Sequence, residues 1–425
     1  MVPDNDQFKT SFKRFAEIVG ADHVRRAAPA DAIDGRLPKL VVEPGSNEEL
    51  ARALAAAAAA GLGVAPRGGG SKMDWGSLPR RVDLVLSTRR LNRVLEHAWA
   101  DMTATVQAGC TVEELQRTLA GRRQRLALDP LWPARATVGG ILATNDSGAL
   151  RLRYGALRDL VIGITVALPA GEIVKSGGKV VKNVAGYDLH KLMIGALGTL
   201  GVIVEAVFRL YPAPRAEQTV SLAVEPAAAL NRIAQQIKAL PAEVTGLQIR
   251  AGSGAQTIVD VRFEGESRSA QDSVRSLPGA QAGRVPAREP GDVWQARERL
   301  WQGAETSLVC KLSILPAQLD ELLELLNQVA AAHRVEWKIV AQATGLCTLR
   351  LEHRDAPALR AALDHLRDAL SGAGGSVSVL RCPPQIKAQI DVWAEAGAAL
   401  SLMRRVKERF DPNWILNPGR FVGGI

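Results

Sequence analysis

The polar and apolar positions of the first half of the chain predict helices and strands in close alternation. Two short segments have the form of a capping box, in which a hydroxyl accepts a backbone N–H at the start of a helix and a carboxylate three residues later reaches back. These pairs are Ser46 with Glu49 and Thr111 with Glu114. Each pair predicts a helix, and the first helix covers residues 51–60 before Gly61 ends it.

Short apolar runs between these helices predict strands. Residues 62–65 form a strand after the first helix, and residues 161–168 and 172–175 form a hairpin around Pro169, Ala170 and Gly171. A buried strand covers residues 201–210 and ends before Pro212. We further expect Asp188 to cap a helix that ends near Gly195. The alanine run near residue 55 is too short and too charged for a membrane span, which needs about 20 apolar residues.

The pattern changes after Pro214 and indicates a domain boundary there. Amphipathic helices are predicted at residues 317–332 and 357–370, and strands at 257–263, 306–314 and 347–352. Residues 265–292 are polar and rich in glycine, proline and arginine, and fit a surface loop or a partly disordered insertion equally well. The predicted division is residues 1–214, residues 215–385, and a returning segment 386–425 that begins with a helix at 394–409.

Two glycine-rich segments suit a bound dinucleotide. Backbone N–H groups can approach a pyrophosphate closely where no Cβ intervenes. One segment, Arg67–Ser71, follows the strand at 62–65, and the other contains Gly139, Gly140, Ser147 and Gly148. Neither segment has the Walker spacing or the G-x-G-x-x-G spacing of a Rossmann unit, so the sequence disfavours ATP and NAD.

With both segments present, the chain resembles the FAD-binding family of vanillyl-alcohol oxidase and the D-2-hydroxyacid dehydrogenases. The resemblance covers about residues 35–214 and the tail. Within that family, KNVAGYDLHKLMIGALGTLGV (residues 182–202) and FDPNWILNPGRF (residues 410–421) look most like the FAD-binding subunits of bacterial glycolate oxidases. The resemblance implies an α+β fold, in which a two-subdomain FAD-binding domain is followed by an α+β cap domain.

The resemblance also implies which residues contact non-covalent FAD. Those around the pyrophosphate would be Arg67, Gly68, Gly69, Gly70, Ser71, Val138, Gly139 and Gly140. Those near the ribityl chain and the ring would be Ala143, Asn145, Ser147 and Gly148. Val202 and Ile203 would pass the adenine end, and Asn417 and Arg420 would close over the isoalloxazine ring.

The chain departs from the wider family at two places. Relatives with covalent FAD often carry histidine just after the first glycine loop, where this chain has Ser71 and Lys72, so we expect FAD that can be washed out. Catalytic hydroxyacid dehydrogenases of the family carry an H-x-G-D-G-N-x-H segment that supplies metal ligands and a base, and this chain has none. His333, His353 and His365 are scattered without metal-ligand spacing, so we expect no metal site and assign no catalytic residue.

Two other residues invite a chemical role. Lys182 would suit a cation near the flavin, and Tyr187 would suit a proton donor, but surface and packing roles are favoured for both.

Three functions follow from the resemblance. The first is the FAD-binding subunit of a complex that oxidises the 2-hydroxy acid glycolate to glyoxylate, alongside a second FAD-containing catalytic subunit and an iron–sulfur subunit. The second is a stand-alone FAD-dependent oxidoreductase acting on another 2-hydroxy acid or alcohol. The third is a non-catalytic assembly subunit. Intact glycines in both loops argue against the third, and the missing histidine segment leaves open whether this chain's own flavin takes the hydride.

Charge, cysteine usage and the N-terminal sequence limit the kinds of partner and the cellular location that we expect. The net charge of +9 is spread along the chain and aromatic residues make up only 4%, so nucleic-acid binding is not favoured, and a cationic face for a partner subunit or anionic lipid fits better. The four cysteines form no C-x-x-C pair, so a zinc site or an iron–sulfur cluster in this chain lacks local ligands, and we expect reduced, mostly buried thiols. Residues 1–9 lack a signal-peptide pattern, which predicts a cytoplasmic protein with at most peripheral membrane association.

Overall fold

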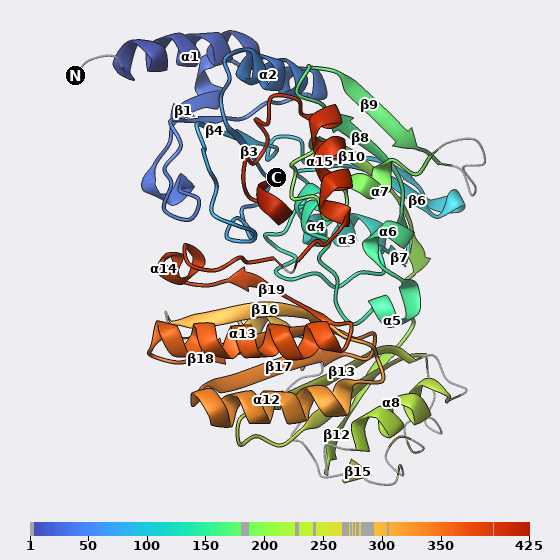
Figure 1. Cartoon of the computed structure of the whole chain (residues 1–425). Coiled ribbons are helices and arrows are strands. Elements are labelled where there is room, and N and C mark those ends of the chain that lie inside the picture. The colour runs from blue at the N-terminus through green and yellow to red at the C-terminus, as the bar shows by residue number, and fades with distance from the viewer. Residues whose placement is uncertain are drawn as a thin grey trace. The chain divides into compact units, whose positions relative to one another are not determined.

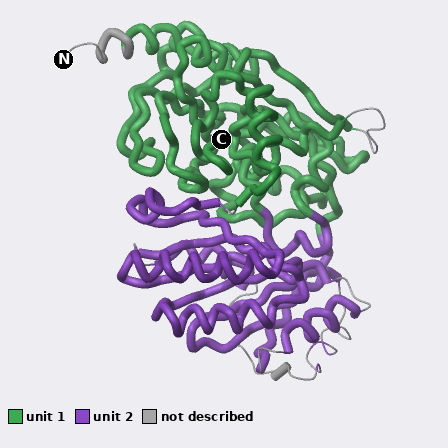
Figure 2. Tube along the Cα trace, viewed as in Figure 1, with its two compact units in different colours: residues 1–146, 156–213, 395–425 green, residues 147–155, 214–394 purple. Residues whose placement is uncertain are grey.

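The computed structural model describes residues 4–179, 187–225, 229–240, 244–265, 272, 274, 277, 280–281, 293–303, 306–393 and 395–425. These residues form two compact units (Figure 2). The first unit contains residues 1–146, 156–213 and 395–425, and the second contains residues 147–155 and 214–394. The predicted insertion at 265–292 lies mostly outside the described residues.

A mixed sheet in the first unit delivers the first glycine loop. Its strands occur in the order β1-β2-β4-β3, with β2, β4 and β3 parallel, and their bounds are β1 Val24–Arg26, β2 Leu40–Val42, β3 Val64–Arg67 and β4 Leu84–Ser87. Helix α2 (Asn47–Ala59) packs on helix α1 (Asp4–Val19) and buries Leu50, Ala53 and Leu54 in the core of this sheet. The alanines of α2 let it pack closely, because they add little bulk.

A second sheet of the first unit is antiparallel, with strand order β5-β6-β10-β8-β9 (Figure 1). Its strands are β5 Val94–Ala98, β6 Thr103–Gln107, β8 Val161–Ala167, β9 Ile173–Gly177 and β10 Val202–Arg209, and a short pair joins β7 Gln124–Arg125 to β11 Tyr211–Pro212. The helices associated with this part of the unit are α3 Val112–Ala120, α4 Val138–Thr144, α6 Leu157–Leu160, α7 His190–Met193 and α15 Ala399–Phe410.

The second unit is built on one antiparallel sheet. Among the described residues the strand order is β15-β12-β14-β13-β17-β18-β16-β19. These strands are β12 Glu217–Val224, β13 Val244–Gly252, β14 Ile258–Glu264, β15 Ala280–Gln281, β16 Ser307–Ser313, β17 Glu336–Gln342, β18 Leu346–Glu352 and β19 Ser376–Arg381.

Three amphipathic helices cover one face of this sheet (Figure 1). They are α8 Leu230–Lys238, α12 Leu319–His333 and α13 Ala356–Gly372. Their apolar stripes, which include Ile233, Leu326 and Leu363, are buried against strand residues such as Ile249 and Leu349. Shorter helices in this unit are α5 Arg151–Tyr154, α11 Ala296–Arg299 and α14 Pro384–Lys387.

Most of the predicted elements are present within about three residues of their predicted bounds. The hairpin of β8 and β9, the strand β10 and the helices α12 and α13 are confirmed. The helix predicted at 394–409 begins later, at Ala399. The predicted cap at Asp188 is wrong, because α7 starts at His190 without a side-chain cap and the Asp188 carboxylate pairs with Lys191 instead.

The two capping boxes are confirmed at the hydroxyl and differ at the carboxylate. Ser46 Oγ accepts from the Glu49 N–H at 3.1 Å, and Thr111 Oγ1 accepts from the Glu114 N–H at 3.2 Å. The Glu49 carboxylate accepts from the Gly45 N–H at 2.7 Å, one residue before the expected donor. The Glu114 carboxylate pairs with Arg117. The hydroxyl therefore makes the expected capping bond in both helices.

Candidate functional site: a glycine-lined cleft in the first unit

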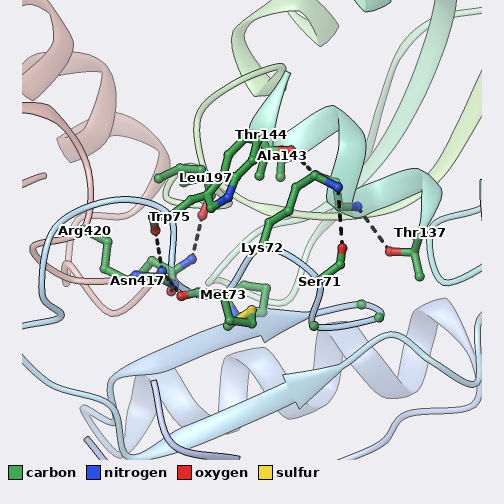
Figure 3. Close-up of a pocket in the computed structure, with 15 residues that line it drawn as sticks. Ser71, Lys72, Met73, Trp75, Thr137, Ala143, Thr144, Leu197, Asn417 and Arg420 are labelled. Carbon is green, nitrogen blue, oxygen red and sulfur yellow. Dashed lines mark hydrogen bonds between the residues drawn. The ribbon is translucent and has the colours of Figure 1, made fainter. Parts of the chain in front are cut away.

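A cleft in the first unit lies where four segments that are distant in sequence come together. These are the loop after β3, the first turns of α4, the turn before β10, and the C-terminal segment (Figure 3). The cleft has two lobes that share Pro66, Gly68, Gly140, Ala143 and Leu197 as lining residues. The two lobes are therefore adjoining parts of one site.

The first glycine loop packs its backbone directly against the segment before α4. An added Cβ at Gly68 would lie 2.0 Å from Thr137 Oγ1, and one at Gly69 would lie 1.7 Å from the Arg135 carbonyl oxygen. Gly70 has a φ of +71°, a conformation that glycine adopts without strain. The three glycines therefore let two backbones approach each other at the wall of the cleft.

Arg67 stands at the start of this loop, and its charge is already paired. Its guanidinium lies 2.8 Å from Asp31 Oδ1, and Arg25 makes two further bonds to the same carboxylate at 2.6 and 2.9 Å. Arg25, together with the Ala28 N–H and Arg67, holds the pKa of the Asp31 carboxyl well below its usual range. Arg67 thus fixes the loop to Asp31 in addition to lining the cleft.

The second glycine pair lies in helix α4, which the sequence did not predict. Thr137 caps α4 by accepting from the Gly140 N–H at 3.3 Å. Gly139 approaches Ala108 so closely that an added Cβ would lie 2.9 Å from the Ala108 Cβ. The helix then presents Ala143 and Thr144 to the cleft. Small side chains on this face keep the shared part of the two lobes open.

A buried lysine lines the cleft just beyond the first loop. Lys72 Nζ lies 3.3 Å from Asp146 Oδ2 and 3.3 Å from the Leu131 carbonyl oxygen. Its ammonium lies 5.8 Å from the ring centroid of Trp75 and 5.4 Å from that of Trp132, within the range of a cation–π interaction. A buried cation therefore stands where relatives with covalent FAD often carry histidine.

The C-terminal segment closes the opposite side of the cleft (Figure 3). Asn417 Nδ2 donates to the Leu197 carbonyl oxygen at 2.6 Å, which ties this segment to the turn before β10. Arg420 donates to the carbonyl oxygens of Trp75, at 2.6 Å, and Met73. Burial lowers the pKa of the Arg420 guanidinium. Arg420 thus joins the tail to the loop that begins at Gly68.

The structure brings most of the residues predicted for FAD into this cleft. The predicted residues that line it are Arg67, Gly68, Gly69, Gly70, Ser71, Gly139, Gly140, Ala143, Val202, Ile203, Asn417 and Arg420. Their contacts with FAD stay predictions, because proximity in a cleft is not binding.

Four predicted residues lie elsewhere. Val138 is fully buried in the first turn of α4. Asn145 ends α4 in the left-handed conformation, and its buried Oδ1 has no hydrogen-bond partner among the described residues. Ser147 and Gly148 belong to the second unit, where the Ser147 carbonyl oxygen accepts from Arg297.

Several lining residues were missed in the sequence: Pro66, Lys72, Met73, Trp75, Thr88, Thr137, Thr144, Leu197, Gly198 and Gly201. Some signals could have found them. Lys72 and Trp75 directly follow the glycine loop, and Leu197, Gly198 and Gly201 lie within the stretch 182–202. Lys182 lies outside the described residues, and Tyr187 is 87% exposed.

The prediction that the histidines of the second unit are scattered needs a correction. His333 and His365 are distant in sequence, but α12 and α13 are neighbours and bring the two rings into a hydrogen bond of 3.2 Å. Among the described residues, no three histidine, cysteine, aspartate or glutamate side chains gather as metal ligands would.

The cleft fits FAD on its own chemistry. Glycines and small side chains allow backbone approach to an extended ligand, and two buried cations, Lys72, which is paired with Asp146, and Arg420, line one lobe, which suits an anionic ligand. The buried Asn145 Oδ1, which has no hydrogen-bond partner among the described residues, lies at the end of α4, one residue beyond Thr144. Small apolar residues dominate the other lobe, which suits the apolar faces of adenine.

Two family models match the chain. Residues 38–177 match an FAD binding domain, and residues 266–421 match the C-terminal domain of FAD linked oxidases. The chain belongs to the FAD-linked oxidases. FAD is therefore its cofactor, and it is an FAD-dependent oxidoreductase.

Curated relatives of this FAD-linked oxidase match along most of its length. It is 24% identical to glycolate oxidase subunit GlcD of Bacillus subtilis, over 90% of this chain and 89% of that protein. It is 29% identical to D-2-hydroxyglutarate dehydrogenase of Xanthomonas citri, over 95% and 92%. It is 28% identical to D-lactate dehydrogenase of Archaeoglobus fulgidus, over 90% and 91%.

Solved structures show the same fold. Substrate-bound p-cresol methylhydroxylase matches with a TM-score of 0.74 at 14% identity, covering 98% of this chain and 96% of that one. Alkyldihydroxyacetonephosphate synthase matches with a TM-score of 0.72 at 20% identity, covering 97% and 86%. The predicted α+β fold with an FAD-binding domain of the vanillyl-alcohol oxidase type is confirmed. No helix among the described residues has the length and apolar character needed to cross a membrane.

Proposed function

We propose that this FAD-linked oxidase is the FAD-binding subunit of a complex that oxidises glycolate to glyoxylate. Its partners in the proposal are a second FAD-containing subunit, which carries the substrate chemistry, and an iron–sulfur subunit that accepts the electrons. FAD supplies a ring that can accept a hydride and pass its electrons on singly. The residues of this chain hold the cofactor non-covalently.

The proposal rests on one combination of features: the glycine-lined cleft is present in the structure, and a histidine-rich motif of the catalytic members is absent from the sequence. The cleft keeps the first glycine loop, the pair Gly139 and Gly140, and two buried cations. The sequence nevertheless lacks the H-x-G-D-G-N-x-H segment expected of members that act on the hydroxyl themselves. A chain that holds flavin and receives its electrons from a partner would combine these two features, and the similarity to a glycolate oxidase subunit supports that setting.

The cleft residues have distinct roles in this proposal. Gly68 and Gly69 let the loop pack against Thr137 and Arg135, which places the loop backbone at the cleft wall where the pyrophosphate would bind. Arg420 would close over the isoalloxazine ring, and Lys72, paired with Asp146, lines the same lobe. Asn417 holds the C-terminal segment over the cleft through Leu197. In the same proposal the second unit, which includes residues 214–394, is the cap domain of the protein.

A stand-alone 2-hydroxyacid dehydrogenase is the second candidate. Identities of 29% and 28% to D-2-hydroxyglutarate and D-lactate dehydrogenases, both higher than that to GlcD, favour it. Both proposals have a 2-hydroxy acid as the substrate. They differ in which acid is oxidised.

Anaerobic reduction of the bound flavin separates the candidates. The purified chain with FAD is mixed with glycolate, D-lactate or D-2-hydroxyglutarate, and the visible spectrum is followed. We expect the flavin to stay oxidised with every acid, and to bleach with glycolate once the two partner subunits are added. Bleaching of the chain alone by any of these acids would favour the stand-alone enzyme and contradict the subunit proposal.

A further inference from the structure

A fully buried ion pair lies behind the C-terminal wall of the cleft. Lys407, on α15, and Asp411, just after it, are both 0% exposed and lie 2.6 Å apart. Lys407 Nζ also donates to the carbonyl oxygens of Thr199, at 2.7 Å, and Leu416, at 3.1 Å. The ammonium carries three protons and makes three bonds, so its hydrogen-bonding capacity is used completely.

Asp411 organises the residues that follow it. Its Oδ1 accepts from the Ile415 N–H at 3.2 Å, and its Oδ2 accepts from the Leu416 N–H at 2.8 Å. The carboxylate therefore fixes the backbone of residues 415 and 416, and the lysine fixes their position relative to Thr199.

The Lys407–Asp411 pair joins the same two segments of the chain as a hydrogen bond inside the cleft does. Thr199 lies in the turn that supplies Leu197, Gly198 and Gly201 to the cleft wall, and Leu416 directly precedes Asn417, which donates to Leu197. The tail and the turn are thus joined twice, once by Asn417 at the cleft and once by Lys407 behind it.

The other side of the tail pairs with the strand that leads to the glycine loop. The Val64 N–H donates to the Ile415 carbonyl oxygen at 2.7 Å, and the Asn417 N–H donates to the Val64 carbonyl oxygen at 2.8 Å. Residues 415–417 therefore lie between β3 and the turn before β10. Any shift of this segment would move Asn417 and Arg420 relative to the glycine loop.

A buried ion pair is weak evidence for stability, because the cost of removing two charges from water offsets most of the attraction between them. Well-packed apolar side chains could fill the same space. They could not hold two carbonyl oxygens and two N–H groups in one arrangement, which is what this pair does.

We propose that Lys407 and Asp411 act as a latch that holds the tail against the turn before β10 and so positions Asn417 and Arg420 for FAD retention. Both are positioning residues, since neither lines the cleft. The proposal rests on FAD binding in this cleft.

The test compares FAD affinity with the stability of the FAD-free protein. The double variant Lys407→Met with Asp411→Asn removes both charges, keeps one acceptor oxygen, and leaves one of the two backbone N–H groups facing the new amide NH2 group. Arg405→Met, which changes an exposed cation on the same helix, is the matched control. For each protein, FAD is titrated into the FAD-free chain under conditions where it is folded, and the unfolding midpoint of the FAD-free chain is measured separately.

We expect the double variant to remain folded and its FAD dissociation constant to rise at least tenfold, while the control keeps the wild-type value. A lower unfolding midpoint with an unchanged dissociation constant would overturn the latch, because that result means a purely structural role. If the double variant does not fold, Lys407→Met alone, which keeps the bonds from Asp411 to the Ile415 and Leu416 N–H groups, gives the same comparison, with a rise again expected and an unchanged constant contradicting the latch. A wild-type chain that binds no FAD would instead contradict the proposed function.

Discussion

At the scale of single residues, Asp31 shows how the cleft is supported from outside. Its carboxylate is 5% exposed and accepts from Arg25, from Arg67 and from the Ala28 N–H. Arg67 begins the glycine loop, so the carboxylate connects the outer strand β1 to the cleft wall. Removing the negative charge would leave these donors without a charged partner at a buried acceptor.

We expect Asp31→Asn to destabilise the protein by roughly 1–3 kcal/mol at pH 7, the usual cost of leaving a buried hydrogen-bonding group poorly satisfied. Because the folded-state pKa of Asp31 lies below its unfolded value, its contribution is complete above the unfolded pKa of about 3.9 and is lost as the pH falls through the folded value. The difference between wild type and variant should therefore shrink below about pH 4.

Denaturant unfolding at pH 7 and pH 3 measures this difference. Asp22→Asn, which changes an exposed aspartate nearby, is the control and should have little effect at either pH. A difference between wild type and Asp31→Asn that stays constant across the two pH values would show that the carboxylate charge is not what stabilises the loop.

The sequence alone predicted site residues whose role depends on the backbone and not on neighbouring side chains. The glycines at 68–70 and 139–140 stood out because the lack of a Cβ is visible in the sequence. Lys72 and Lys407 did not stand out, because what distinguishes a buried lysine from a surface one is the set of acceptors that the fold places around it. The pairing of Arg67 with Asp31 was missed for the same reason, since 36 positions separate the two residues.

At the scale of elements, caps and turns account for where the helices begin. Ser46 starts α2 and Thr111 starts α3 through bonds within one helical turn, and such local signals are readable from sequence. Helix α4 was not predicted, because its glycines have poor helix propensity and its cap, Thr137, is fixed by the close approach of the glycine loop. Tertiary packing decides that helix.

Replacing the cap of α2 should have a modest and specific effect. We expect Ser46→Ala to lower the free energy of unfolding by about 1 kcal/mol, because the Glu49 N–H loses its acceptor. Ser46→Thr keeps a hydroxyl and should stay close to wild type. Denaturant midpoints of the three proteins measure the effect, and equal losses in both variants would show that packing at Ser46, and not the cap, is what matters.

At the scale of the whole molecule, each unit keeps its cysteines inside. All four are free and buried, as the sequence predicted. Burial raises the pKa of Cys110 to about 11 and those of Cys310 and Cys347 to about 12. Since the thiolate is the reactive form, these three thiols should react very slowly in the folded protein.

A thiol reagent such as DTNB at pH 8 tests the packing of both units at once. We expect little reaction of the native protein, with Cys382, which is 9% exposed, reacting first, and four thiols after unfolding in guanidinium. Rapid modification of Cys310 or Cys347 in the native protein would mean that the core of the second unit opens readily.

The fold as a whole was predictable because periodic patterns and the resemblance agreed on its class. The assembly of the cleft was not predictable from spacing, since it depends on contacts between residues more than 300 positions apart, such as Arg420 with Trp75. The contact also explains why the C-terminal segment belongs to the first unit although the second unit precedes it in sequence.

FAD should occupy the cleft between the glycine loop and α4, and the amount of FAD bound per chain in a variant with a filled cleft measures whether it does. Ala143 lines both lobes, so Ala143→Phe should place a ring in their shared part without altering a glycine. Ala120→Phe adds the same ring at an exposed helical position and serves as the control.

We expect about one acid-releasable FAD per chain for the wild type and for Ala120→Phe, and almost none for Ala143→Phe when circular dichroism shows that the protein is folded. Full FAD binding by a folded Ala143→Phe protein would contradict the assignment of the cleft.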